Sequence, residues 1–427
     1  MIFNSSKEKL LFFHISSILF SLIPFFLITG PFLSDLSISL ISIFFLIYCA
    51  KNNNFSFFKN KFFYFFFVFW VYLILNSLFN NFSFNNLGTS VVYGRYGIFV
   101  IAIVALLNTD DKFIKYFFYC IFICFIILIL DGFYQYFIGE NILGWRNAER
   151  TSSFFGEEKI LGSYVSRLWP IFFGLSIFIF KQKNKLFILF IIIFILSETL
   201  IFLSGDRSAF FNINLSAIFV LLFSQKLFKL RLIILLSSIL LIVVISMVNP
   251  TSKERVFDKT LNQMNLGGQN ISIQNELNGI KEIYIFSEQH THHYITGYKM
   301  FQDNKIFGVG IKNFRKFCSD ERYKESELSC STHPHNTYIQ ILAETGLFGF
   351  LFLIIALFYF CKYAFIHLLL RFKGKYFFTD FEICVLSGIV IYLWPLIPTG
   401  SFFTNWLSIL MFLNIPFLIW GRQINRT

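Results

Sequence analysis

Twelve long apolar stretches follow one another along this 427-residue chain, and they leave little choice of fold. A helix of about 20 mostly apolar residues is long enough to cross a bilayer. Such a helix also satisfies its backbone hydrogen bonds within its own segment, which lipid demands. The candidate spans are residues 9–29, 33–50, 62–79, 92–108, 113–136, 160–180, 186–204, 210–224, 232–248, 338–361, 381–397 and 402–420. The sequence therefore predicts an all-α polytopic membrane protein with about 12 transmembrane helices.

The composition agrees, because 56% of the chain is hydrophobic and only 14% is charged. An ordinary soluble domain is about 25% charged. A soluble enzyme would lack the polar surface needed to cover so much apolar mass. Lys7 and Lys9 precede the first stretch, and no small-residue cleavage site follows it, so we expect a retained helix.

The net charge of +12 is explained by topology once the charges are placed between the spans. Alternate connecting segments are rich in Lys and Arg, and these segments face the cytoplasm by the positive-inside rule. They contain Lys51, Lys59, Lys61, Lys112, Lys115, Lys181, Lys183, Lys185, Lys226, Lys229, Arg231, Lys362, Arg371, Lys373, Lys375, Arg422 and Arg426. Both termini are predicted to be cytoplasmic, the expected partner is the lipid bilayer, and nucleic acid is not expected.

The opposite, periplasmic face holds the longest connection, which divides the chain into residues 1–248, 249–334 and 335–427. The first and last parts carry spans one to nine and ten to twelve. The central loop contains Arg255 and four of the seven histidines, and His335 follows it directly. A structureless loop of this length is uncommon and usually functional. We expect a large, partly helical loop over the outer mouth of the bundle.

Cys318 and Cys330 both lie in this loop, whereas the other five cysteines lie in or beside apolar spans. Two cysteines in an oxidising compartment are candidates for a disulfide. A zinc site is the alternative, but the sequence has no C-x-x-C spacing.

A polar motif, His333-Pro334-His335-Asn336, opens span ten. Pro334 suits the first turn of a helix, with Thr332 or Ser331 as the cap. His335 would then lie at the water-facing start of the span, where a neutral imidazole can accept a proton. A hydrogen-bonded interfacial histidine is the structural alternative. We expect Gly346 and Gly349, on one face of the helix, to allow close approach of a neighbouring helix.

Arginines mark two further outer segments. Arg207 lies between spans seven and eight, at the outer lip of a span, where guanidinium is expensive without a partner but well suited to phosphate. Arg146 and Arg150 lie in the loop before span six, and Arg167 lies within that span, one turn deeper than Ser163. A salt bridge with Asp206 for Arg207, and with a loop carboxylate for Arg150, are the structural alternatives.

These motifs together resemble the O-antigen ligase family, membrane glycosyltransferases that are similar to O-antigen polymerases. The resemblance rests on His335-Asn336 followed after nine residues by Gly-x-x-Gly, and on the loop motifs His290-Thr-His-His293 and Phe307-Gly-Val-Gly310. It covers residues of about 190–355. Phe350 departs from the Thr, Ser or Tyr often found in ligases.

The resemblance implies a bacterial inner-membrane enzyme of lipopolysaccharide biosynthesis with a periplasmic active site. It would move a glycan from an undecaprenyl-diphosphate donor to a lipid A-core sugar, with inversion and without metal or cofactor. His335 would be the catalytic residue, and Arg207 with Arg150 would bind the donor diphosphate. Possible supporting residues are Arg146, Arg167, His293, Asn336 and Arg255.

Three alternatives remain open at this point. A polymerase would use the same donor but a growing glycan as acceptor, and a protein O-oligosaccharyltransferase would use a protein hydroxyl. A transporter for a lipid-linked solute would need polar residues along a path through the spans. The loop histidines are also a conceivable metal site, but His292 and His293 point apart on a helix and no carboxylate is fixed nearby.

Overall fold

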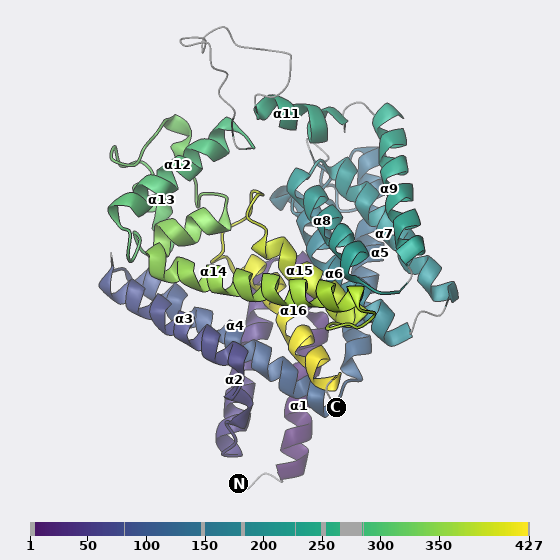
Figure 1. The fold of residues 1–427 in the computed structure, drawn as a ribbon, viewed down its shortest axis with the longest axis horizontal. Helices are drawn as coiled ribbons and strands as arrows, with labels where there is room; N and C mark the ends of the chain where they lie inside the picture. The colour runs from purple at the N-terminus through teal and green to yellow at the C-terminus, as the bar shows by residue number, and fades with distance from the viewer. Residues whose placement is uncertain are drawn as a thin grey trace.

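The computed structural model describes residues 5–80, 82–146, 150–180, 184–226, 228–248, 253–264, 284 and 286–425. Figure 1 shows a helical bundle with both chain ends in the lower half of the view and α11 and α12 near the top. The elements are α1 (Ser5–Thr29), α2 (Pro31–Lys51), η1 (Ser56–Phe58), α3 (Lys61–Phe79), α4 (Phe84–Thr109), α5 (Phe113–Ile138), η2 (Ser153–Glu158), α6 (Leu161–Phe180), α7 (Asn184–Ser204), α8 (Arg207–Phe223), α9 (Phe228–Val248), η3 (Glu254–Asp258), α11 (Lys259–Gln263), α12 (Glu288–Asp303), α13 (Phe314–Phe317), η5 (Glu327–Ser329), α14 (Thr337–Phe372), α15 (Asp380–Leu393) and α16 (Asn405–Ile424).

The all-helical, membrane-type fold expected from the sequence is present in the described residues. Eight helices there are long and apolar enough to cross a membrane: α1 to α6, α14 and α16. Helices α7, α8 and α9 contain shorter apolar segments of 10–17 residues. The expected span at 381–397 is shorter than predicted, because α15 ends at Leu393 and Pro395 and Pro398 follow. The count of twelve spans therefore stays a prediction.

Phenylalanine side chains fill the centre of the bundle. Phe20 of α1 stacks on Phe117 of α5 with ring centroids 4.6 Å apart, and Phe118 of α5 stacks on Phe172 of α6 at 5.2 Å. All four rings are almost completely buried. Stacked and edge-on aromatic pairs add to the energy of area burial. The abundance of phenylalanine thus serves packing.

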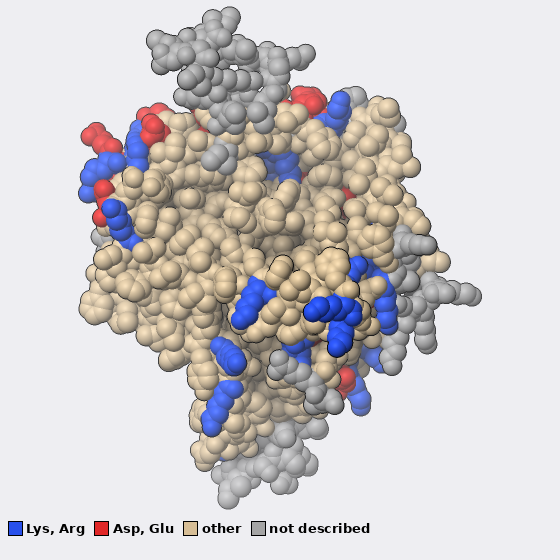
Figure 2. Space-filling model, viewed as in Figure 1, with Lys and Arg blue, Asp and Glu red and all other residues tan. Residues whose placement is uncertain are grey.

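Charged side chains are unevenly distributed on the face shown in Figure 2. The lower half, near the chain ends, carries mostly Lys and Arg, whereas most visible Asp and Glu lie along the upper edge. This is the asymmetry from which the positive-inside rule predicts cytoplasmic termini. The long connection after α9 forms short helices in its described part, and α11, α12 and α13 lie in the upper half of Figure 1.

Helix α14 differs from the sequence expectation at two places. It begins at Thr337, with Asn336 as its cap, so Pro334 and His335 precede the helix. It also breaks at Gly346, whose φ is +62°. The backbone at Ile306 fills the space beside Gly346, so a Cβ there would lie 2.4 Å from the Ile306 carbonyl oxygen. The expected glycine contact with a neighbouring helix is wrong for Gly346, which meets a loop, while Gly349 lies against Tyr72 of α3.

Candidate active site

Four histidine rings meet between α12 and the segment that precedes α14. The ring centroid of His335 lies 4.1 Å from that of His333, 5.3 Å from that of His293 and 5.4 Å from that of His290. His290 and His293 are one turn apart on α12, so one helix face presents both. His293 is completely buried and makes no hydrogen bond of standard geometry through its ring. We call these four residues the histidine cluster.

Asn336 and Thr399 hold the backbone of His335 in an unusual conformation. The φ of His335 is +54°, a left-handed value that is uncommon for a residue with a side chain. The Asn336 side chain accepts hydrogen bonds from the N–H groups of Tyr338 and Ile339 and donates one to the Pro395 carbonyl at 2.8 Å. The Thr399 N–H donates to the His335 carbonyl at 2.8 Å. Such strained residues persist only when their surroundings hold them, and they cluster at functional sites.

The loop between α15 and α16 therefore helps to hold the histidine cluster in place through Thr399. Besides its contact with His335, Thr399 bonds through its carbonyl to His333 Nε2 at 3.1 Å and through its hydroxyl to Thr337 at 3.1 Å. Sequence reasoning did not find Thr399. The available signal was only that this short loop lies on the predicted outer face, because Thr399 is 64 positions from His335.

Burial keeps the cluster neutral. Loss of solvent lowers the pKa of His335 to about 3, with further lowering from His333, His290 and His293. For the same main reason the pKa values of His290 and His333 fall to about 4, and that of His293 is also lowered. Ser331 Oγ lies 3.0 Å from His335 Nε2. If Nε2 donates to this hydroxyl, Nδ1 is the basic nitrogen of His335.

Arg207 is the first residue of α8, which begins three residues before the expected start of span eight. The Asp206 side chain caps α8 by accepting a hydrogen bond from the Ala209 N–H at 3.1 Å. The Arg207 guanidinium donates to Thr260 Oγ1 at 3.2 Å and to Gln263 Oε1 at 2.8 Å, both from the α11 segment. Arg207 also lies close enough to His290 to help lower that pKa. Arg207 is therefore within electrostatic range of the histidine cluster.

The other arginines expected to take part in the site are Arg146, Arg150, Arg167 and Arg255. Arg146 is exposed and forms an isolated backbone β-bridge with Glu140, while Arg150 is partly exposed and has no hydrogen bond or ion pair with another described residue. Arg167 is buried in α6, donates to Ser163 and lies over the Tyr392 ring at 5.5 Å. The side chain of Arg255 lies outside the described residues, as does that of Glu149, the proposed partner of Arg150. The structure does not bring Arg146 or Arg167 into contact with His335.

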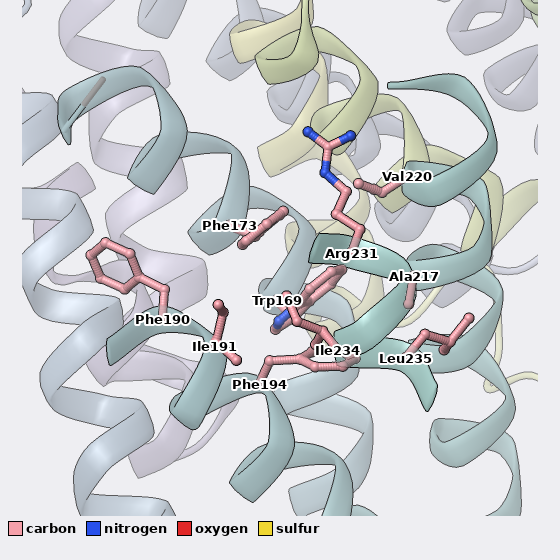
Figure 3. A pocket seen from close by; sticks show the side chains of 10 residues that line it. All are labelled: Trp169, Phe173, Phe190, Ile191, Phe194, Ala217, Val220, Arg231, Ile234 and Leu235. Atoms are coloured by element: carbon pink, nitrogen blue, oxygen red, sulfur yellow. The ribbon is translucent and has the colours of Figure 1, made fainter. Parts of the chain in front are cut away.

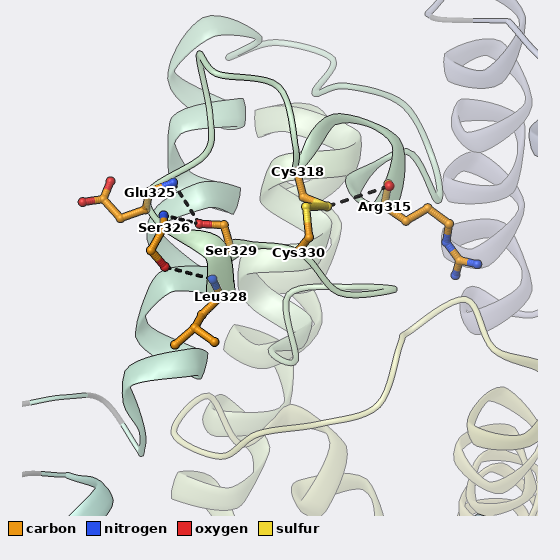
Figure 4. The surroundings of a disulfide bond; sticks show 7 residues. All are labelled: Arg315, Cys318, Glu325, Ser326, Leu328, Ser329 and Cys330. Carbon is orange, nitrogen blue, oxygen red and sulfur yellow. Dashed lines mark hydrogen bonds between the residues drawn. A yellow bond between two sulfur atoms is a disulfide. The ribbon is translucent and has the colours of Figure 1, made fainter.

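A disulfide joins Cys318 to Cys330, the pair expected from the sequence, and ties α13 to the segment of the histidine cluster. The linkage is drawn in Figure 4, where Cys318 follows α13 directly. Among the described residues, no group of three or more His, Cys, Asp or Glu side chains is arranged to hold a metal ion.

An apolar pocket lies elsewhere, among α6, α7, α8 and α9 (Figure 3). Its one charged lining residue is Arg231, which donates to Asp380 at 3.3 Å. None of its lining residues belongs to the histidine cluster.

The comparisons with known proteins agree with the resemblance drawn from the motifs. Residues 188–354 match the family model described as O-antigen ligase. No protein in the curated collection matches the chain. The matched region contains Arg207, the histidine cluster, the disulfide and the break in α14. Over this region the chain is similar to the O-antigen ligase family.

Proposed function

We propose that the protein is an O-antigen ligase that transfers a glycan from undecaprenyl diphosphate to a lipid A-core sugar. The observation that carries the proposal is the neutral, backbone-strained His335 in a cluster whose edge is adjacent to Arg207. The similarity to the family supports ligase- or polymerase-type glycosyl transfer. The setting would be the periplasmic face of the bacterial inner membrane.

Arg207 is suited to the donor diphosphate for two reasons. Its planar guanidinium can bind phosphate oxygens through two hydrogen bonds. It also stands at the N-terminus of α8, where the helix dipole favours negative charge. Charge develops on the diphosphate as the glycosidic bond breaks, so fixed positive charge there stabilises the transition state. In this proposal Arg150 is the second candidate for the same role.

His335 is suited to the acceptor hydroxyl. It accepts the proton as oxygen attacks the anomeric carbon, and the configuration inverts in this single displacement. A pKa of about 3 makes a weak base in the free protein. An anionic donor beside the cluster would raise that pKa, because nearby negative charge favours the protonated imidazole. His293 stacks on His335 and Asn336 holds its backbone, so both act as positioning residues.

A transporter is less well supported. Two buried polar pairs join apolar helices: Glu198 of α7 accepts from Ser238 of α9, and Arg231 of α9 pairs with Asp380 of α15. Such pairing is typical of structural contacts between helices. A polymerase and a protein O-oligosaccharyltransferase share the proposed donor chemistry and differ only in the acceptor.

The acceptor is tested with a strain from which the gene is deleted. Loss of all O-antigen-capped lipopolysaccharide on a gel indicates a ligase. A band of core plus one repeat unit would instead show a polymerase, and unchanged lipopolysaccharide with loss of glycoprotein would show the protein-glycosylating type.

The residue roles are tested in the same strain with single substitutions. His335→Ala should abolish transfer while donor binding remains, and Arg207→Ala should lose both. His292→Ala and Arg322→Gln are matched controls, since His292 lies outside the cluster beside Glu288 and Arg322 pairs locally with Asp320. Full transfer by His335→Ala would refute the general-base role.

A further inference from the structure

A second pair of basic side chains, Lys312 and Arg315, lies just before and on α13, which the Cys318–Cys330 disulfide ties to the segment of the histidine cluster. Arg315 lies on α13 and is close enough to His333 to contribute to the lowering of its pKa. Arg207 affects His290 in the same way. Arg315 and Arg207 therefore act on different histidines of the cluster. In Figure 1, α13 lies at the left and α8 lies to the right of the centre.

The backbone that carries this pair is firmly attached to the first turns of α14. The N–H groups of Val309 and Gly310 donate to the carbonyls of Ala343 and Glu344 at 2.8 and 2.9 Å. The buried Glu344 carboxylate accepts from the Phe314 N–H at 3.2 Å. Arg315 is thereby held at a set position relative to His335, which precedes the same helix.

The disulfide adds a second attachment. Cys318 comes three residues after Arg315, and Cys330 comes three residues before His333. Figure 4 shows the Arg315 side chain extending away from the disulfide. The covalent link thus brings an exposed guanidinium and the histidine cluster into one unit.

Neither cation of the pair has a direct ion-pair partner among the described residues. Lys312 has a φ of +57° and is partly buried, and its pKa is lowered by burial and by the neighbouring Arg315. Among the described residues no carboxylate lies within ion-pair distance of Lys312 or Arg315. Glu344 interacts electrostatically with both cations, but it is buried and already accepts hydrogen bonds from Phe314 and Gln340. Two adjacent cations without a direct ion-pair partner favour an anionic ligand.

The stereochemistry of an inverting transfer indicates which of the two substrates carries the anionic group. In a single displacement the attacking oxygen approaches the anomeric carbon from the face opposite the leaving group. If the leaving diphosphate is at Arg207, the acceptor must enter from another flank of His335. We propose that Lys312 and Arg315 bind a phosphate or carboxylate on the acceptor saccharide and so place its hydroxyl at His335. This inference rests on the proposed function and adds the acceptor's chemical class.

The test is a binding measurement on the full-length protein in lipid nanodiscs. The probe is fluorescently labelled core oligosaccharide in three forms: intact, dephosphorylated with hydrofluoric acid, and carboxyl-reduced. We expect the wild type to bind the intact form about tenfold or more tightly than one of the two neutralised forms. Equal affinity for all three forms would overturn the proposal.

Substitutions assign the preference to residues. Arg315→Gln and Lys312→Gln should weaken binding of the intact probe and abolish the difference between its forms, and Arg315→Lys should restore part of it. Lys316→Gln removes an exposed charge from the same short helix and should leave the preference unchanged. A preference that persists in Arg315→Gln and Lys312→Gln would overturn the assignment. Glycan transfer is assayed separately, so its absence from a protein with the anion preference counts against the proposed function alone.

Discussion

Replacement of Asn336 by alanine removes the contacts that hold His335 in place. Asn336 is almost fully buried, and its side chain makes three hydrogen bonds. Two of them cap α14 at Tyr338 and Ile339, and the third reaches the Pro395 carbonyl. His335 directly precedes Asn336 and has a left-handed φ. We therefore expect Asn336→Ala to allow His335 to adopt ordinary backbone conformations.

The size of the effect follows from these bonds. Loss of a side-chain cap costs about 1 kcal/mol, and loss of the bond to Pro395 costs about 1 kcal/mol more. If the sum of about 2 kcal/mol opposes the active position of His335, the transfer rate falls about 30-fold. Asn336→Asp keeps the acceptor for the cap and loses only the donor to Pro395, so its rate should fall about 5-fold.

The assay is glycan transfer by purified protein at saturating donor, with donor affinity measured separately. Donor affinity should stay within a factor of about two, because Arg207 is untouched. Thr379→Ala is the matched control. It removes the cap of α15, where Thr379 accepts from the Glu382 N–H at 3.3 Å, at the end of that helix remote from Pro395. A wild-type rate for Asn336→Ala, or an equal loss for Thr379→Ala, would refute the positioning role.

Three further outcomes are expected. Because burial holds the pKa of His335 near 3, kcat/KM should show no acid limb at the ordinary histidine value of 6.5, and a limb there in a pH profile would contradict its neutral burial. Replacing Cys318 and Cys330 by serine should destabilise the loop by about 3 kcal/mol, seen as faster limited proteolysis that reductant reproduces in the wild type. Gly308→Ala should lower thermal stability more than Gly374→Ala, although both have positive φ, because only Gly308 would place its Cβ against backbone, at 2.5 Å; equal losses would argue against that packing.

Local sequence predicted the helices better than their ends. Apolar length alone indicates a membrane helix, so each of the expected spans coincides with a helix, at least in part. The start of α14 was wrong because several neighbouring residues can cap a helix, and the choice of Asn336 depends on Pro395, far along the chain. Gly346 was taken for a helix-packing residue, since nothing local shows that a loop backbone occupies the space beside it.

The candidate site was predictable to the same limited extent. His335 and His293 lie together, Arg207 acts electrostatically on the neighbouring His290, and the family motif had indicated all three of His335, His293 and Arg207. The motif could not show that four imidazoles pack against one another, or that Arg146 and Arg167 lie apart from His335.

The sequence by itself determined the helical membrane fold, the similarity to the O-antigen ligase family and the residue types available for chemistry, since apolar length and short motifs are local properties. Only the tertiary structure decided which of those residues meet. The left-handed His335 is held by Thr399 from a distant loop, and its neutrality comes from burial among three other histidines. The Cys318–Cys330 disulfide ties α13, which carries Arg315, to the segment that leads to His335. Each of these depends on contacts between segments far apart in the chain, which no local pattern encodes.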